Sequence, residues 1–222
     1  MAALAVGAKA PDFALKTVDG TRFCLSEELA RGAVVLAFFK VSCPTCQYAF
    51  PFLERLHRAY GGRTREGKVQ GRKPNSDGDA GAALKGRSST NAPSIGASSA
   101  GASSTGRSSI GASTGVGLPA IVSLIGVSQN DANDTAAFIK EFGITFPVLL
   151  DDTRSYPASN AYGLTNVPSI FYVARDGEIE VSSVGWMRAD FDDINRRMAD
   201  AGRIAPAVMF RPGEDVRDFQ AG

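Results

Sequence analysis

The strongest constraint on the fold of this chain is a continuous apolar run that leads into two closely spaced cysteines. Residues 33–40 begin Ala-Val-Val-Leu-Ala-Phe-Phe and follow Gly32, and a Cys-Pro-Thr-Cys motif occupies positions 43–46. An uninterrupted apolar run of this length is typical of a strand that is buried on both faces of a sheet. Residues 44–60 then show a helical pattern. A buried strand that passes directly into a helix indicates a layered α/β architecture.

The rest of the chain, outside a Gly- and Ser-rich tract, also alternates between strand and helix patterns. The turn signal Arg175-Asp176-Gly177 predicts a hairpin between the last two strands. Candidate helix N-caps are Ser26, Asp131 or Asn133, and Asp190. The predicted strands are residues 21–25, 33–40, 119–127, 146–150, 169–174 and 178–184. The predicted helices are a short one after residue 26, a second over residues 44–60, a third that ends at residue 142, and a fourth from residue 190 to about 201. This order predicts an α/β sandwich with a mixed central sheet.

Residues 61–117 form a low-complexity tract inside this pattern. Of its 57 residues, 13 are Gly, 11 are Ser and 8 are Ala, and none of the 19 aromatic residues of the chain lies there. Its eight basic and three acidic residues give it a charge of +5. Such a tract buries too little apolar surface to offset the entropy of ordering it, so we expect a disordered insertion. A solvated insertion without a dedicated role is the simpler interpretation, and a basic tether for an acidic partner is the alternative.

Composition and charge exclude several classes of protein. Three cysteines are too few for a disulfide-stapled secreted scaffold, and a formal charge of +1 does not suit a dedicated nucleic-acid binder. The longest apolar run has seven residues, about a third of what a helix needs to cross a bilayer. The first eight residues lack the basic segment of a signal peptide. We therefore expect a cytoplasmic protein with no membrane anchor and no nucleic-acid partner.

The Cys-Pro-Thr-Cys motif carries the clearest chemical signal. Cys43 is expected at the helix N-terminus, where free backbone N–H groups and the helix dipole favour a thiolate. Pro44 suits the first turn because its missing N–H has no intrahelical partner there, and Thr45 completes the motif. Cys46 lies on the same helix face, so Cys43 can attack a disulfide and Cys46 can then resolve the mixed disulfide.

A zinc site is the competing interpretation of the cysteine pair. Structural zinc sites use two Cys-x-x-Cys pairs, or one pair together with two histidines. This chain adds only Cys24 and His57 to the pair, so no second ligand pair exists. We therefore expect no bound metal.

A second signature lies at Val167-Pro168, directly before the predicted strand 169–174. Together with the strand, cysteine motif and helix, it resembles the thioredoxin-like superfamily. The opening Ala10-Pro11-Asp12-Phe13 is similar to the redoxin branch, which includes the alkyl hydroperoxide reductase/thiol-specific antioxidant proteins and the thioredoxins of cytochrome c maturation. The resemblance covers residues 7 to about 201 without the insertion.

This resemblance implies several properties beyond the residue patterns themselves. It implies a thioredoxin-like sandwich formed by residues 1–60 and 118–204, with helices on both faces and an N-terminal extension of strands. It implies that Pro168 is cis and lies against the cysteine pair, and that the Val167 backbone pairs with a substrate peptide. No bound cofactor is needed, and the partners are disulfide-bearing proteins or small molecules together with an upstream thiol reductant.

The sequence departs from the peroxiredoxin pattern at two positions. Peroxiredoxins carry a proline seven residues before the peroxidatic cysteine and Thr or Ser three residues before it, and this chain has Leu36 and Lys40 there. The missing hydroxyl argues against efficient peroxide reduction. Arg154 and Arg175 are available as the arginine that such a site needs, but the sequence does not place either one.

The sequence also departs from thioredoxin itself. The buried carboxylate expected six residues before the first cysteine is replaced by Ala37, and the preceding tryptophan is replaced by Ser42. Proton transfer for Cys46 must then use water or another group, with Lys40 as one candidate.

Four further features need an interpretation. Trp186 follows the Gly185 that would border the active surface, so it either lines the substrate groove or packs against the last helix. His57 lies about 16 Å along the helix from Cys46 and is expected to be a surface or packing residue. Cys24 is expected to be a buried structural thiol, with a remote resolving thiol as the alternative. Residues 205–222 are expected to form an extended tail without an assigned role.

These inferences support one main hypothesis and two alternatives. The main hypothesis is a thiol-disulfide oxidoreductase that uses Cys43 as nucleophile and Cys46 as resolving thiol. The first alternative is a peroxiredoxin-type peroxidase that uses the same thiols. The second is a non-enzymatic interaction module that uses the basic insertion as its contact.

Overall fold

The computed structural model describes residues 3–61 and 121–222. The predicted insertion, 61–117, lies outside the described residues except for Gly61.

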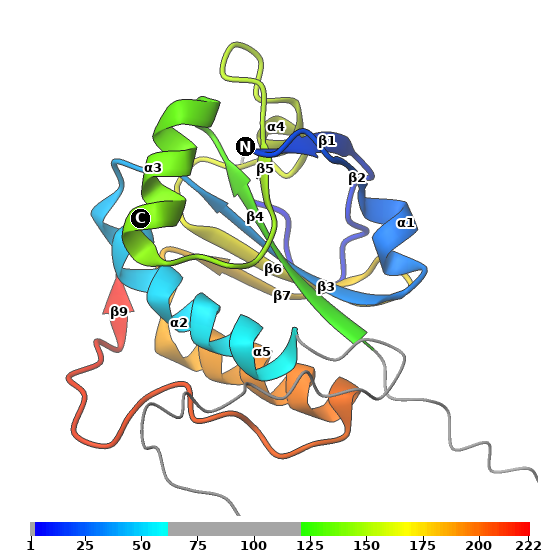
Figure 1. The fold of residues 1–222 in the computed structure, drawn as a ribbon. Coiled ribbons are helices and arrows are strands. Elements are labelled where there is room, and N and C mark those ends of the chain that lie inside the picture. Colours follow the sequence, from blue (N-terminus) through cyan, green and yellow to red (C-terminus); the bar gives the residue numbers. More distant parts are fainter. Residues whose placement is uncertain (1–2, 62–120) are drawn as a thin grey trace, which may run out of the picture. The chain divides into compact units, whose positions relative to one another are not determined.

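The described residues form a layered α/β fold around one large sheet (Figure 1). The strands are β1 (Ala14–Thr17), β2 (Arg22–Cys24), β3 (Gly32–Phe39), β4 (Ile121–Ser128), β5 (Val148–Leu150), β6 (Ser169–Val173), β7 (Ile179–Val184), β8 (Trp186–Met187) and β9 (Phe219–Gln220). The helices are α1 (Leu25–Leu29), α2 (Pro44–Tyr60), α3 (Ala132–Phe142), α4 (Pro157–Ala161) and α5 (Arg188–Gly202).

The central sheet is mixed, as predicted. Its seven strands follow the order β2-β1-β5-β4-β3-β6-β7. The inner strands β3, β4 and β5 run parallel, whereas β6 and β7 on one side and β1 and β2 on the other are antiparallel to their neighbours. The β1–β2 hairpin is the N-terminal extension that the family resemblance implies.

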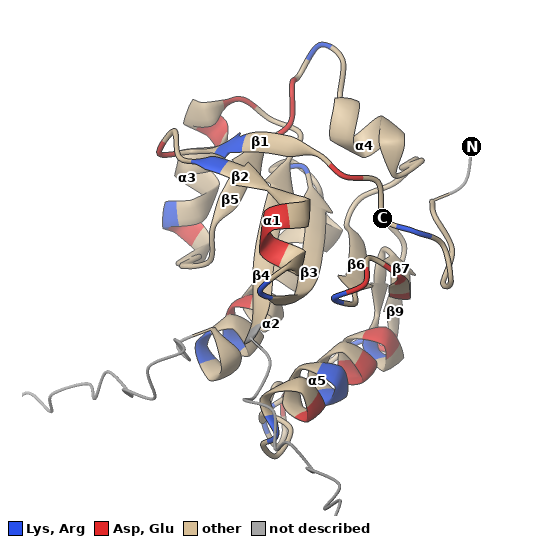
Figure 2. Cartoon of the chain, turned by 90° about the vertical axis from the view of Figure 1, so that its right-hand side faces the viewer, with Lys and Arg blue, Asp and Glu red and all other residues tan. Residues whose placement is uncertain are grey.

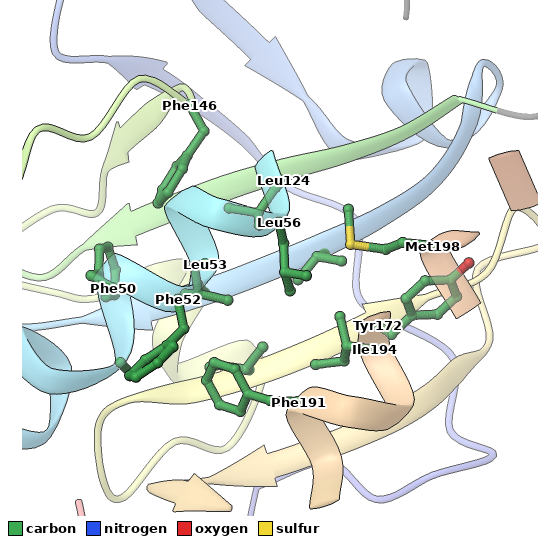
Figure 3. Close-up of a cluster of buried hydrophobic side chains, with 14 of the residues drawn as sticks. Phe50, Phe52, Leu53, Leu56, Leu124, Phe146, Tyr172, Phe191, Ile194 and Met198 are labelled. Carbon is green, nitrogen blue, oxygen red and sulfur yellow. The ribbon is translucent and has the colours of Figure 1, made fainter. Parts of the chain in front are cut away.

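Helices cover both faces of this sheet, and β3 contributes to the core on each face. Val35, Ala37 and Phe39 point toward the cluster formed with α2, α3 and α5. The alternate residues of β3, such as Leu36 and Phe38, join the cluster beneath α1 and α4. Figure 3 shows aromatic and aliphatic side chains of α2 and α5 packed against the first of these faces. Burial of every β3 residue explains why the sequence there is apolar without alternation.

Helix α2 has the predicted bounds, and α3 is capped by Asp131, whose carboxylate accepts the N–H of Asp134 at 2.9 Å. Two other predicted caps were wrong. Ser26 lies inside α1, and its N–H donates to the carboxylate of Asp12 at 2.9 Å, so the acceptor comes from a distant segment. Asp190 lies in the first turn of α5, which begins two residues earlier at Arg188.

Helix α5 carries acidic and basic residues close together along its length (Figure 2). Asp193 accepts hydrogen bonds from Arg196 at 2.9 Å and from Arg197 at 3.0 Å. Arg197 also pairs with Glu180 of β7, which joins the helix to the sheet. Within residues 3–61 and 121–222, none of the helices has both the length and the apolar character needed to cross a membrane.

The expectation of an extended tail at 205–222 needs correction, because this segment packs against the rest of the fold. Met209 is buried, and the ring of Phe210 lies 5.3 Å from that of Phe52 on α2. Strand β9 pairs antiparallel with β8. In Figure 1 the segment runs from the end of α5 and returns through β9 toward the start of α2. The sequence does not predict this packing, because β9 has only two residues and forms a strand only by pairing with β8.

Candidate active site

The two cysteines of the motif lie at the junction between β3 and α2. Cys43 is the N-cap of α2, and its sulfur accepts the N–H of Cys46 at 3.3 Å. Pro44 occupies the first helical position, where it leaves no intrahelical hydrogen bond unmade. The three cysteines of the chain are free thiols in this structure.

The two thiols have different environments. Cys43 is half-buried, whereas Cys46 is fully buried, one turn into the helix. Burial strongly raises the pKa of the Cys46 thiol, and the neighbouring Cys43 raises it further. The Cys43 sulfur, which is more accessible and lies at the helix N-terminus, is therefore the one that can react with an external disulfide. The buried Cys46 sulfur lies beside it.

The Val167-Pro168 peptide lies beside this junction and is cis. Strand β6 begins at Ser169, which pairs with Phe38 near the end of β3, so the sheet register brings this peptide to the cysteines. The thiol of Cys43 donates to the carbonyl oxygen of Val167 at 3.2 Å. The structure thus brings together Cys43, Cys46, Val167 and Pro168, which the sequence analysis had placed in one site.

A cavity of about 220 Å³ is lined in part by Val167. Its walls include Lys40, Gln129, Asn160 and Val167. The Lys40 ammonium lies 5.8 Å from the centre of the Tyr156 ring. Lys40, the candidate proton-transfer group, therefore lines a space at the edge of the site.

Two of the other sequence-selected residues lie within the packed part of the fold. Trp186 is fully buried, with its ring centre 4.3 Å from that of Phe191 on α5, so it packs against the last helix and does not line a groove. The His57 ring packs edge-on against Phe146, and burial lowers the pKa of its imidazole. His57 lies in the last turn of α2, far along the helix from the motif at its start.

Cys24 and Arg175 also lie away from the cysteine pair. Cys24 is half-buried at the N-cap of α1, with its sulfur 3.2 Å from the hydroxyl oxygen of Ser26. Arg175 donates to the carbonyl of Ala30, which precedes β3, whereas the cysteines follow that strand. In the part of the chain that the structure describes, no cluster of three His, Cys, Asp or Glu side chains is arranged to hold a metal ion.

One component of the site, the end of the 205–222 segment, carries no recognisable motif in the sequence. The hydroxyl of Thr45 donates to the carbonyl of Ala221 at 2.6 Å. The side-chain amide of Gln220 donates to the Thr45 oxygen at 2.8 Å. The sequence offers no signal for these contacts, because residues more than 170 positions apart meet only in the folded chain.

Comparisons with known proteins agree with this geometry. The family model described as Redoxin matches residues 5–64. A curated relative, the thiol-disulfide oxidoreductase ResA of Geobacillus kaustophilus, is 24% identical over 197 residues, which cover 88% of this chain and 78% of the relative.

Solved structures show the same architecture. A thiol:disulfide interchange protein of the thioredoxin family from Chlorobium tepidum has a TM-score of 0.52 at 20% identity, with 90% of this chain and 99% of the other covered. The thioredoxin domain of a thiol-disulfide oxidoreductase from Bacteroides vulgatus has a TM-score of 0.55 at 14% identity, with 87% and 97% covered. The fold is therefore thioredoxin-like. The Redoxin match over residues 5–64 and the similarity to the ResA proteins agree with this fold.

Proposed function

We propose that this protein is a thiol-disulfide oxidoreductase whose reactive pair is Cys43 and Cys46. The observation that carries the proposal is the asymmetry of the pair, with a half-buried sulfur at the N-terminus of α2 and a fully buried sulfur one turn further on. Relatives of the ResA type, which are named thiol-disulfide oxidoreductases, support the same class of activity.

The proposed reaction has two exchange steps. The Cys43 thiolate attacks one sulfur of a substrate disulfide, which forms a mixed disulfide and releases the other substrate sulfur as a thiolate. Cys46 loses its proton and attacks the Cys43 sulfur, which releases the second substrate thiol and leaves a Cys43–Cys46 disulfide. The substrate gains two electrons and the protein loses two, so an upstream thiol reductant is needed to regenerate the dithiol.

The neighbouring groups suit these steps. The N–H of Cys46, which reaches the Cys43 sulfur at 3.3 Å, is oriented to stabilise negative charge there. The Val167 carbonyl accepts a hydrogen bond from the Cys43 thiol at 3.2 Å and therefore lies directly beside the reactive sulfur. We infer that a substrate disulfide binds along this side, with protein disulfides or small disulfides as the substrate class.

Single-cysteine variants test the proposal. The Cys43→Ser variant should lose reaction with a disulfide-bonded protein, whereas Cys46→Ser should react once and remain trapped as a mixed disulfide visible by mass spectrometry. Cys24→Ser is the matched control and should turn over like the unmodified chain. Trapping on Cys46 in the Cys43→Ser variant at the unmodified rate would overturn the assignment.

A parallel reaction with hydrogen peroxide separates this function from the peroxidase alternative. Rapid exchange with the disulfide, and peroxide reactivity no greater than that of a model thiol, is the expected result. Peroxide reactivity far above the model thiol would favour a peroxidase, and slow reaction with both would favour an interaction module.

A further inference from the structure

We propose that residues 219–222 occupy the surface along which a protein disulfide reaches Cys43, so that a protein substrate must displace this segment. The inference rests on the proposed function for its consequence and on contacts in the structure for its geometry. The surface is formed by Thr45 of the motif, by Asn166 and Val167, and by Gly185 at the end of β7.

The segment lies close to the reactive sulfur. The carbonyl of Val167 is the group that the Cys43 thiol contacts at 3.2 Å. Gly222 lies directly on that group, since a Cβ added to Gly222 would lie 2.4 Å from the same carbonyl oxygen. Asn166 next to it donates to the Gly222 carbonyl at 3.2 Å. A large reactant that approaches Cys43 from this side meets the segment first.

The backbone of residues 219–222 also packs closely against the backbone of this surface. Gly185 has a φ of +81°, and a Cβ there would lie 2.7 Å from the Gln220 carbonyl oxygen. Two glycines therefore allow the segment and the loop after β7 to approach each other. Hydrogen bonds link Gln220 to Thr45 and Thr45 to Ala221 at 2.8 and 2.6 Å. These contacts use backbone and small polar groups, which an extended peptide of another protein can also supply.

The preceding residues hold the segment in place. Glu214 forms two hydrogen bonds of 2.7 Å with the guanidinium of Arg55 on α2, and these bonds lower the pKa of Glu214 to about 2. The Arg217 carbonyl accepts the indole N–H of Trp186 at 2.6 Å, and the Arg217 N–H donates to the hydroxyl of Tyr48 at 2.9 Å. Residues 214–217 are thus tethered, and the proposed displacement concerns residues 219–222.

Because the tether keeps the segment close to the site, it competes with an external peptide at high effective concentration. Only the population in which residues 219–222 have lifted is open to a protein disulfide, so the apparent rate is the rate of this open form multiplied by its fraction. A small disulfide needs less of the surface and should be affected less.

Removal of residues 219–222 tests this inference in the otherwise complete chain. The variant should react with a disulfide-bonded protein at least about threefold faster than the unmodified chain, while its rate with a small aromatic disulfide changes by less than about twofold. The Gln220→Ala variant, which keeps the backbone of β9, should shift in the same direction by a smaller factor. Asp215→Asn, at an exposed residue that precedes residues 219–222, is the matched control and should not change either rate.

A binding measurement decides the inference independently of any thiol reaction. A peptide with the sequence of residues 219–222, labelled with fluorescein at its N-terminus, should bind the shortened variant, measured by anisotropy, and should bind the unmodified chain much more weakly. Emission from Trp186 and thermal unfolding verify that the shortened variant is folded. If it does not fold, the same peptide and rates are measured with Gln220→Ala.

The outcomes separate the inference from the proposed function. If no form of the protein exchanges with disulfides but the peptide still binds the shortened variant more tightly than the unmodified chain, the proposed function is wrong. The inference that residues 219–222 occupy this surface is then still supported. If exchange depends on Cys43 but neither its rate nor peptide binding differs between the folded shortened variant and the unmodified chain, the inference is overturned.

Discussion

At the residue scale, the reactivity of the cysteine pair depends on how differently the fold buries two neighbouring thiols. Cys46 lies beneath the first turn of α2 among the core residues, whereas Cys43 remains half-buried at the N-cap. Thiolate is the nucleophilic form, and burial in apolar surroundings disfavours it. The resolving step should therefore be limited by removal of the Cys46 proton.

This limitation predicts a pH dependence for the second exchange step. Burial is the main cause of the raised pKa of Cys46 in the reduced protein and does not depend on a free Cys43 thiol, so we expect the pKa to stay raised in the mixed disulfide. The thiolate fraction of Cys46 should then grow about tenfold per pH unit between pH 6 and 9, and the mixed disulfide should decay faster in proportion. Quenched-flow mass spectrometry of the mixed disulfide measures this rate. A rate that levels off near neutral pH would mean that another group takes the proton before solvent does.

The third cysteine gives a simpler prediction at the same scale. Cys24 is half-buried beside Ser26 and Asp12, at the β2–α1 junction and not at the β3–α2 junction that holds the reactive pair. The Cys24→Ser variant should keep its exchange rate within about twofold and lose less than about 1 kcal/mol of stability. Stopped-flow exchange and urea unfolding measure the two quantities. A large loss of turnover with intact folding would identify Cys24 as a redox partner instead.

At the element scale, a buried carboxylate joins α2 to the loop before β5. Glu54 is 4% exposed and accepts hydrogen bonds from the N–H and the hydroxyl of Thr145 at 2.8 and 2.6 Å, and from Arg58 at 2.6 Å. These hydrogen bonds outweigh the effect of burial and lower the pKa of Glu54 below its usual value of 4.5. The ionised carboxylate therefore stabilises the folded state.

The Glu54→Gln variant should be less stable by about 1–3 kcal/mol at pH 7, because a neutral amide accepts these hydrogen bonds less strongly. Since the folded-state pKa is lowered, the contribution of Glu54 is fully present above pH 4.5 and is lost as the pH falls through the folded value. Urea unfolding measures the free energy of unfolding of the variant and of the unmodified chain at each pH. The difference between the two chains should be larger at pH 7 than at pH 3. Equal differences at both pH values would contradict the assigned role of the charge.

The elements that could be predicted from the sequence are those with a local physical cause. Strand β3 is apolar because both faces are buried, and α2 begins at Pro44 because proline suits the first helical turn. Helix α4 was missed because it has five residues and no side-chain cap. Strand β9 was missed because its two residues form a strand only against β8. In the site, Cys43, Cys46 and Pro168 belong to recognisable sequence motifs and could be predicted. The contacts of Gln220 and Ala221 could not, because they depend on packing between distant parts of the chain.

At the scale of the whole molecule, the described residues before and after the predicted insertion contribute to the same core. Helix α2 ends at Tyr60 and β4 begins at Ile121, and α2 packs against β4 within one cluster of buried residues. The two ends of the predicted insertion thus adjoin core elements. The sequence of the segment between them is rich in Gly, Ser and Ala and carries a charge of +5 over residues 61–117.

Replacement of residues 62–117 by a Gly/Ser linker of about ten residues should therefore preserve the fold and the thiol chemistry. Loop-closure entropy changes only logarithmically with loop length, so a shorter connection should change stability by no more than about 1–2 kcal/mol. Urea unfolding and the exchange rate of the Cys43–Cys46 pair measure the two effects in the shortened and complete chains. Loss of cooperative unfolding would show that the segment belongs to the core. Loss of an acidic binding partner with unchanged exchange would instead assign the segment an interaction role, because its positive charge would then act separately from the cysteines.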